Sequence, residues 1–182
     1  MPGPLVARGE CVTLRTVEEE DHAFVQRGCT NPGTRIPLGT PVRSRSEMDD
    51  GDDDGDRFLV CLDDGSPDAP DRDDVVRLGV VSVEDMDWRR PELGYWLVSE
   101  RHGEGYGAEA VGLVVDYTFR TYDHPAVGAI AYDFNDASRG LLESLGFEEE
   151  GRIRRDRFID GRYVDSVSYS LLRENWDDGR NR

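Results

Sequence analysis

A glycine-rich segment in the middle of the chain has the residue types best suited to ligand binding: it reads Arg-His-Gly-Glu-Gly-Tyr-Gly-Ala over residues 101–108. Glycine lets the backbone approach a ligand closely, and a helix beginning there adds converging N–H groups and partial positive charge. The segment therefore predicts a phosphate-binding loop. It also fits the dinucleotide fingerprint G-x-G-x-x-A, but that fingerprint belongs in a parallel βαβ unit, whereas an antiparallel hairpin is predicted here before residue 101. The Gly-Lys-Ser/Thr ending of an ATP-binding loop is absent.

Helix and strand patterns surround this loop. Apolar residues at helical spacing follow it, and a capping box at Thr16 and Glu19 predicts an earlier helix. Asn135 or Asp136 caps a third, short helix, which Gly146 ends. Alternating or β-branched runs predict strands at residues 11–15, 57–62, 75–83, 92–98, 127–132, 152–159 and 167–172. This order predicts an α+β (mixed α/β) fold.

Two segments are rich in turn formers and aspartate. Residues 30–57 are predicted to be a loop with a short helix near residues 46–50, and residues 63–74 a solvated loop. The length of 182 residues favours one domain, to which we assign residues 1–176, with a frayed tail at 177–182.

Composition narrows the class of protein. The 39 acidic residues outweigh the 22 basic ones, giving a formal net charge of −17, so nucleic acid is a poor partner. No apolar run approaches the roughly 20 residues of a membrane span, and the start has no signal pattern. Cys11, Cys29 and Cys61 are widely spaced and form no metal-binding pattern. These features predict a cytoplasmic protein with reduced thiols, no membrane contact and no metal.

Every basic residue is arginine, because the sequence contains no lysine, and aspartate is concentrated in runs such as residues 49–54. Such self-repulsion destabilises a compact chain in dilute salt and is screened when ions are concentrated. The composition favours a halophilic protein from a cytoplasm with molar salt. The alternative is an ordinary acidic protein from a GC-rich genome.

A set of short motifs occurs in one order along residues 10–176. They are Leu14-Arg15 with Glu20-Asp21, the run Glu-Leu-Gly-Tyr-Trp-Leu at 92–97, the glycine loop followed by Glu109-Ala110, Asn135-x-x-Ser138, Leu145-Gly146-Phe147, and Gly161-x-Tyr163-x-Asp165 before Tyr169-Ser170-Leu171. With this set the chain resembles the GNAT acyltransferase superfamily, and within it the RimJ/RimL-type branch that acetylates protein N-termini. The resemblance implies a single splayed, mostly antiparallel sheet with helices on both faces.

The resemblance also implies acetyl-CoA as co-substrate, an amine acceptor, and a fold that is compatible with a homodimer. The pyrophosphate loop aligns with His102, Gly103, Glu104, Gly105, Tyr106, Gly107 and Ala108. His102 replaces the usual Gln or Arg, and Glu104 places a repulsive carboxylate that Arg101 could offset. Backbone groups of Leu97 and Val98 are implied to bind the pantetheine arm, and the Asn135 side chain to contact the cofactor or cap a helix.

Two residues are candidates for proton transfer. Glu92 aligns with the glutamate that serves as general base in similar acetyltransferases, and a half-buried carboxylate could act through water. Ser138 lies where related enzymes place a serine near the CoA sulfur, and Leu142 stands where others carry a tyrosine acid. Each residue also has a purely structural interpretation: Glu92 as an exposed residue at the edge of a strand, and Ser138 as an ordinary residue in the first turn of a helix. Tyr95 and Trp96 are read as packing residues.

The sequence thus predicts transfer of an acetyl group from acetyl-CoA to a primary amine, with a protein N-terminal α-amine as the leading acceptor. The alternatives are a small-molecule amine acceptor, a non-catalytic acyl-CoA-binding module and, more distantly, a dinucleotide-binding oxidoreductase.

Overall fold

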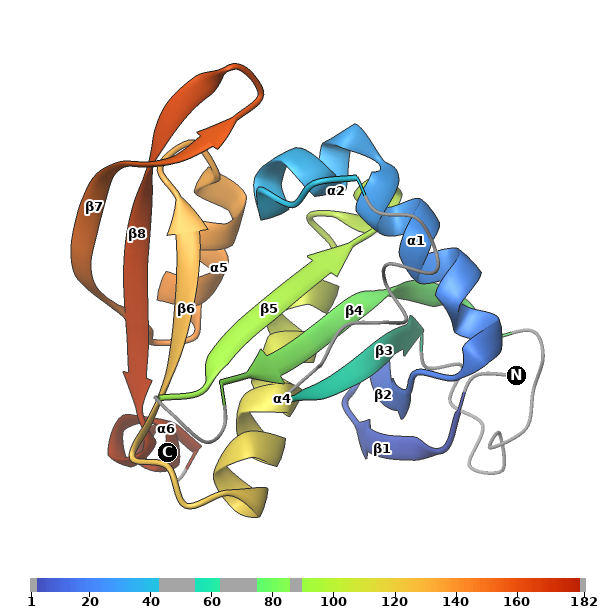
Figure 1. Cartoon of the computed structure of the whole chain (residues 1–182). Coiled ribbons are helices and arrows are strands. Elements are labelled where there is room, and N and C mark those ends of the chain that lie inside the picture. Colours follow the sequence, from blue (N-terminus) through green and yellow to red (C-terminus); the bar gives the residue numbers. More distant parts are fainter. Residues whose placement is uncertain (1–2, 43–54, 63–74, 86–89, 181–182) are drawn as a thin grey trace.

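The computed structural model describes residues 3–42, 55–62, 75–85 and 90–180, which form an eight-stranded sheet with helices on both faces (Figure 1). The strand order is β1-β2-β3-β4-β5-β6-β8-β7. The strands are β1 (Leu5–Arg8), β2 (Val12–Thr16), β3 (Asp56–Leu62), β4 (Arg77–Glu84), β5 (Glu92–Leu97), β6 (Ala126–Tyr132), β7 (Glu148–Ile159) and β8 (Arg162–Leu172). The helices are α1 (His22–Thr30), α2 (Pro32–Leu38), α4 (Tyr106–Thr121), α5 (Asp136–Ser144) and α6 (Arg173–Arg180), with short 3-10 turns η1 (Glu19–Asp21) and η2 (Ser99–Arg101).

The sheet opens between β5 and β6, its one parallel pair of neighbours. These strands are paired only at Glu92 with Gly128 and at Leu93 with Ala129. Beyond Leu93 they diverge, while β5 stays paired with β4 as far as Leu97. The facing edges of β5 and β6 therefore leave a V-shaped gap at the centre of the sheet, which confirms the splayed, mostly antiparallel sheet that the family resemblance implies.

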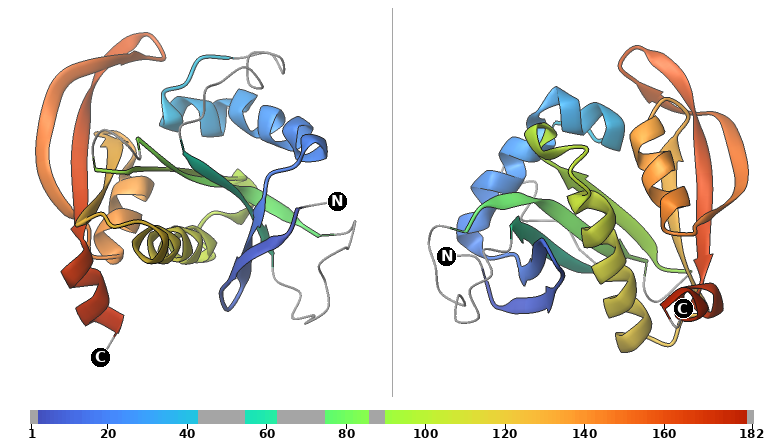
Figure 2. Two further views of the ribbon diagram at one scale, coloured as in Figure 1. Left: turned by 60° about the horizontal axis from the view of Figure 1, so that its bottom comes forward. Right: turned by 180° about the vertical axis from the view of Figure 1, so that it is seen from behind.

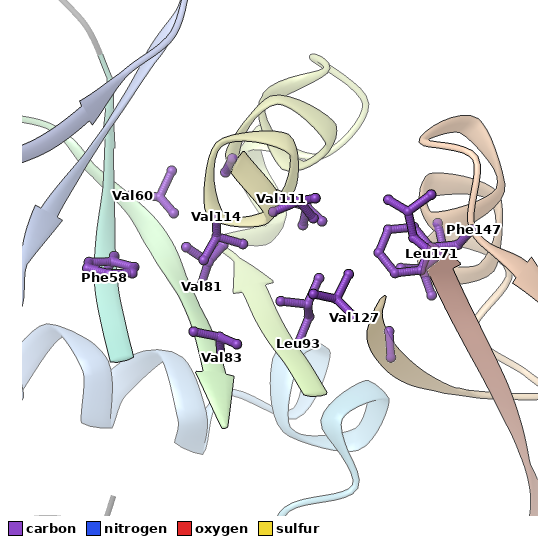
Figure 3. Close-up of a cluster of buried hydrophobic side chains, with 14 of the residues drawn as sticks. Phe58, Val60, Val81, Val83, Leu93, Val111, Val114, Val127, Phe147 and Leu171 are labelled. Carbon is purple, nitrogen blue, oxygen red and sulfur yellow. The ribbon is translucent and has the colours of Figure 1, made fainter. Parts of the chain in front are cut away.

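Helices cover the two faces because side chains alternate along each strand. α4 covers one face, where Val81 and Leu93 pack against Val111 and Val114 (Figures 2 and 3). α1 and α2 cover the other face over a smaller cluster that includes Trp96. Burial of each such aliphatic side chain contributes about 1.5–3 kcal/mol, so these two layers fix the position of β5 beside the gap.

Three helices or strands were not foreseen: β1, α2 and α6. β1 is only four residues long, too short to show the alternation of apolar and polar residues that marks a strand, and it is held by pairing with β2. α2 lies in the segment that was predicted to be a loop. Asn31 caps it by accepting a hydrogen bond from Gly33 N, Pro32 takes its first position, and Gly39 ends it in the left-handed conformation. The same Asn-Pro-Gly residues that read as a turn are also typical of a helix start.

Other boundaries shift. The capping box lies at Glu18 and Asp21 rather than at Thr16 and Glu19, because Thr16 is the last residue of β2. Helix α6 continues through Arg180, over part of the tail that was predicted to be frayed. The short helix predicted near residues 46–50 and the loop at 63–74 lie outside the described residues.

Candidate active site

A cavity of about 940 Å³ occupies the gap between β5 and β6. Its wall comes from both faces of the sheet, since α1 and α2 line one side and the start of α4 and of α5 the other. Nine residues that the sequence singled out lie on this wall: Glu92, Leu97, His102, Gly103, Gly105, Gly107, Ala108, Asn135 and Ser138. The splay therefore gathers residues from three separate stretches of the chain: β5, the glycine loop with the start of α4, and the start of α5.

The alternation along β5 divides the chemistry between the two faces. Leu93, Tyr95 and Leu97 belong with the core on the α4 side, and Trp96 belongs with the α1 cluster. Glu92 shares the phase of Trp96, so its carboxylate is directed to the face that α1 and α2 cover. A ligand bound on the α4 side can therefore meet one bound on the α1 side at the gap in the sheet.

Glu92 is half-buried and has carboxylate neighbours. It lies directly opposite Glu84 in the β4–β5 register. Burial raises the pKa of Glu92 above its ordinary value, and the charges of Asp85 and Glu84 raise it further, although Arg90 and Arg157 oppose them. A carboxylate with a raised pKa is a stronger base once it is ionised, which suits it to accept a proton from an ammonium group.

The glycine loop is shaped as an anion cradle. Gly103 and Gly105 have φ angles of +81° and +87°, and a Cβ atom added to either would meet no atom within 4 Å. Gly105 is the N-cap of α4 and supplies no side-chain cap, so the first N–H groups of a 16-residue helix face the cavity mouth without a side-chain acceptor. Uncapped N–H groups and the helix dipole together favour a phosphate group.

Gly107 serves close packing instead. A Cβ atom at Gly107 would lie 2.9 Å from Leu141 Cδ1 and 3.1 Å from Leu97 Cδ1. The first turn of α4 can therefore approach both β5 and α5. The absence of a side chain at this position keeps the start of the helix at the gap.

The two residues that depart from the family pattern have local partners. His102 Nε2 lies 3.0 Å from the carbonyl oxygen of Leu97, which ties the loop to the end of β5. Arg101 Nη1 lies 3.7 Å from Glu104 Oε2, so an arginine partly offsets the loop carboxylate. A hydrogen bond to Glu104 also raises the pKa of Tyr106. Glu104 and Tyr106 do not line the cavity.

The first turn of α5 presents Ser138 to the cavity. Asn135 caps the helix, and its side chain accepts a hydrogen bond from Ser138 N at 3.2 Å. Ser138 Oγ is hydrogen-bonded to the Tyr95 hydroxyl at 2.7 Å, which bridges the gap from β5 to α5. Asn135 thus has the capping role in this structure, and Ser138 is held from two sides.

Tyr95 is a site residue that the sequence reading missed. It lines the cavity, and burial raises its pKa to about 12, so the hydroxyl keeps its proton at neutral pH. The sequence did show on which face Tyr95 lies. Side chains alternate along a strand, so Tyr95 points to the same side as Leu93 and Leu97, the side that α4 covers. Its contact with Ser138 depends on where α5 packs, which the spacing of residues does not reveal.

Val98 lies at the end of β5 outside the cavity lining, and its N–H donates to Leu78 O at 2.7 Å. Its backbone N–H is therefore already bonded within the sheet. Among the described residues, no group of three or more His, Cys, Asp and Glu is arranged to hold a metal ion. In the same part of the chain, no helix has the length and apolar character needed to cross a membrane.

Comparison with known proteins gives consistent matches. The family model described as acetyltransferase (GNAT) domain matches residues 12–148. The chain is 34% identical over 101 residues to the Bacillus subtilis protein YdaF, named as a proposed ribosomal N-acetyltransferase, covering 54% of this chain and 55% of that protein. It is 34% identical over 88 residues to the ribosomal protein uS5-alanine N-acetyltransferase of Escherichia coli, covering 48% and 45%. The chain thus spans about half the length of the curated relatives it matches.

The fold also matches a solved structure. The crystal structure of spermidine N-acetyltransferase from Vibrio cholerae in complex with CoA and spermine superposes with a TM-score of 0.79. The match covers 91% of this chain and 97% of that one, at 22% identity. The superposition shows that the two chains share a fold.

Proposed function

The chain belongs to the acetyltransferase (GNAT) domain family, and from this premise we propose that it transfers an acetyl group from acetyl-CoA to a primary amine. The observation that carries the proposal is the cavity in the splayed sheet, which has an uncapped helix N-terminus on one wall and the Glu92 carboxylate on another. This arrangement joins a site for phosphate groups to a site for proton removal.

The residues present fit a CoA molecule. The first turn of α4, with Gly103 and Gly105 before it, would hold the pyrophosphate through backbone N–H groups. Within the part of the chain that the structure describes, the edge of β5 that faces the gap lacks a strand partner beyond Leu93, so the pantetheine amides can add to it as a strand would. The acetyl thioester then lies near the point where the two strands diverge.

In the proposed reaction, the amine nitrogen forms a bond to the acetyl carbon and the carbon–sulfur bond breaks. The ammonium form must first lose a proton, which Glu92 accepts directly or through water. When the tetrahedral intermediate collapses, the nitrogen loses its second proton and the departing sulfur takes one. Ser138, whose hydroxyl is hydrogen-bonded to Tyr95, can relay this proton by giving its own to the sulfur and accepting the one from the nitrogen. The products are an acetamide and a CoA thiol, so no redox cofactor is needed.

The proposed acceptor is the α-amine of a protein N-terminus. The match to the ribosomal protein uS5-alanine N-acetyltransferase supports this choice. The edge of β6 that faces the gap is also without a strand partner beyond Ala129 among the described residues, so an extended peptide end could pair there. Glu92 lies at the root of the gap, where the first residue of such a peptide would arrive.

A small polycationic amine is a second candidate acceptor. Glu84 and Glu92 lie opposite each other across β4 and β5, and Asp156 of β7 also lines the cavity. Three carboxylates around one cavity would attract a second or third ammonium group. Three arginines, Arg57, Arg101 and Arg157, also line the cavity, so its charge is balanced rather than acidic, and this balance favours the singly charged N-terminus.

Thiol release from acetyl-CoA, measured in about 1 M KCl, tests the proposal. Peptides with different N-termini are compared with spermidine and with free amino acids. We expect release with peptides and none without an amine. Release that is fastest with spermidine would replace the N-terminal acceptor by the polycation. Binding of acetyl-CoA without release with any amine would leave a non-catalytic binding module, and no binding would overturn the proposal.

A matched pair of variants locates the base. Glu92→Gln is expected to lower kcat about 10²–10⁴-fold, the range for loss of a general base. Glu84→Gln removes a neighbouring carboxylate of the same wall and is expected to change the KM of a charged acceptor more than kcat. Equal loss of kcat in both variants would contradict the role of Glu92.

A further inference from the structure

The wall of the cavity across the gap from β5 is formed by β6 and the β7–β8 hairpin (Figure 1). Ala129 and Ala131 of β6 belong to the core on the α4 side. Because side chains alternate along a strand, Tyr132 lies on the other face, which is also the face of Glu92. A Cβ atom added at Gly39 would lie 2.5 Å from Tyr132 Oη, so Tyr132 reaches the end of α2. In the proposed reaction this is the side from which the amine arrives.

Asp156 and Arg157 both line this wall, although they are consecutive residues of β7. Consecutive side chains of a regular strand point to opposite faces, so a local irregularity must turn one of them. Ser166 pairs with Tyr132 in the β6–β8 register and shares its face. The Ser166 hydroxyl donates a hydrogen bond of 2.7 Å to Asp156 Oδ2, which places Asp156 on the Glu92 face as well.

The irregularity is a bulge in β7, where residues 154–156 stand across from a single residue of β8, Asp165. Arg155 has a φ of +53°, which residues other than glycine rarely adopt, and its N–H donates to Asp165 Oδ1 at 2.9 Å. The carbonyl oxygen of Asp165 accepts from Asp133 N at 3.0 Å, so Asp165 is itself anchored to the end of β6. Asp165 also ends one of the motifs in the sequence, and it holds this bulge. Bulges are frequent beside active sites, where they re-aim side chains.

The bulge leaves two charged groups available to a ligand. The side chain of Asp156 is 32% accessible and that of Arg157 is 65% accessible. Asp156 Oδ1 accepts no hydrogen bond within the part of the chain that the structure describes, and Arg157 Nε lies 3.6 Å from Asp156 Oδ2, too far for a strong hydrogen bond. Burial raises the pKa of the Tyr132 hydroxyl, and the charges of Arg157, Asp156 and Glu92 also act on it. The pair therefore lies near the proposed base.

We propose that Asp156 and Arg157 recognise a peptide group of the acceptor, with the carboxylate accepting from its N–H and the guanidinium donating to its C=O. This inference rests on the proposed acetyl transfer and adds the groups that distinguish a protein N-terminus from other amines. A polyamine is attracted by the carboxylate and repelled by the guanidinium, and for the carboxylate of a free amino acid the two effects are reversed. A peptide group is served by both side chains at once.

The test compares Asp156→Ala and Arg157→Ala with Arg154→Ala, which changes a charge of the same bulge that does not line the cavity. Thiol release is measured at about pH 8.5, because Arg157 lowers the pKa of Glu92 and the base must be ionised in every variant. The acceptor is a short peptide with an N-terminal alanine. Asp156→Ala and Arg157→Ala are each expected to raise its KM about tenfold or more with little change in kcat, and Arg154→Ala by less than about twofold.

Spermidine separates recognition of the peptide group from a general loss of structure. It is measured as an acceptor or, where it is not acetylated, as a competitor of the peptide. Asp156→Ala is expected to weaken spermidine, whereas Arg157→Ala is expected to strengthen it because a like charge is removed. Damage to the hairpin would instead weaken both ligands in both variants and would overturn the proposal. Melting temperatures establish that each variant is folded.

Asp165 is a positioning residue, because it acts through the bulge. Asp165→Ala is expected to raise the KM of the peptide as the two variants of the pair do. The side-chain oxygen of Asp165→Asn can still accept the Arg155 N–H, so this variant is expected to restore most of the lost affinity. Equal losses in both variants of Asp165 would contradict its positioning role.

Fluorescence anisotropy of the peptide, labelled at its C-terminus and titrated at saturating CoA, reports recognition without turnover. Binding about tenfold weaker in both variants of the pair supports the proposal; if the wild type then releases no thiol, only the acetyl transfer is overturned. Thiol release with an unchanged peptide KM in either variant would overturn the recognition and leave the acetyl transfer standing. A wild type that neither binds nor acetylates the peptide would overturn both.

Discussion

The hydrogen bond between Tyr95 and Ser138 leads to a prediction about catalysis. When Tyr95 donates to Ser138 Oγ at 2.7 Å, the serine keeps its own proton free to point into the cavity. Tyr95→Phe removes that hydroxyl and retains the ring in the core. A neutral hydrogen bond contributes about 0.5–1.5 kcal/mol net, so kcat is expected to fall about 2- to 13-fold. The melting temperature is expected to fall about 1–6 °C for a chain of this size.

The assay is thiol release at saturating acetyl-CoA for Tyr95→Phe, Ser138→Ala and the double variant. Because Tyr95 acts through Ser138, the double variant is expected to match Ser138→Ala in kcat. Tyr117→Phe is the control. The Tyr117 hydroxyl donates a hydrogen bond of 2.9 Å to Asp56, and Tyr117 does not line the cavity, so this substitution is expected to lower stability without changing kcat. The pKa of about 12 means that the loss in Tyr95→Phe is independent of pH below about 10. Losses that multiply in the double variant would refute the coupling.

Three further predictions concern stability. The pKa of Glu92 in the folded state is raised above 4.5, so ionised Glu92 lowers the free energy of unfolding at neutral pH. Below pH 4.5 the carboxyl is protonated in both the folded and the unfolded state, and this effect disappears. Thermal scans of Glu92→Gln are therefore expected to show a raised melting temperature near pH 7 but not near pH 4. Arg173 donates to the carbonyls of Phe119, Tyr122 and His124 at the end of α4, and Arg173→Lys, which cannot reach all three, is expected to lose about 1–3 kcal/mol in urea unfolding. With a net charge of −17, the melting temperature is expected to rise steeply with KCl up to about 1 M, and to rise further in sodium sulfate; a flat curve would favour an ordinary acidic protein.

The middle of the chain was the part most readable from sequence. β5, the glycine loop, α4 and β6 follow from strand and helix periods and from a loop whose glycines have a geometric purpose. These elements are long and strongly patterned, so local signals and the final packing agree. The order of motifs then placed Glu92, Ser138 and the glycine loop around one site, and the structure brings them to one cavity.

The other elements, and the role of Tyr95, could not be predicted from the sequence because they depend on contacts with residues distant in the chain. β1 exists through pairing with β2, and α2 begins at residues that signal a turn equally well. Tyr95 is the clearest case at the site. As a strand residue its phase was readable, but its role depends on the packing of α5 forty-three residues later in the chain.

The loop that departs from the family pattern has a physical logic that fits the acidity of the chain. A pyrophosphate approaching a chain of net charge −17 meets long-range repulsion, and Glu104 adds to it nearby. In the binding mode that we propose, the attraction comes mainly from backbone N–H groups at the start of α4, which act at hydrogen-bond distance, while Arg101 offsets Glu104. Concentrated salt screens charges separated by more than a few ångströms and leaves direct hydrogen bonds largely intact. Salt would therefore weaken the repulsion more than the binding, so a backbone cradle with few basic side chains suits this composition.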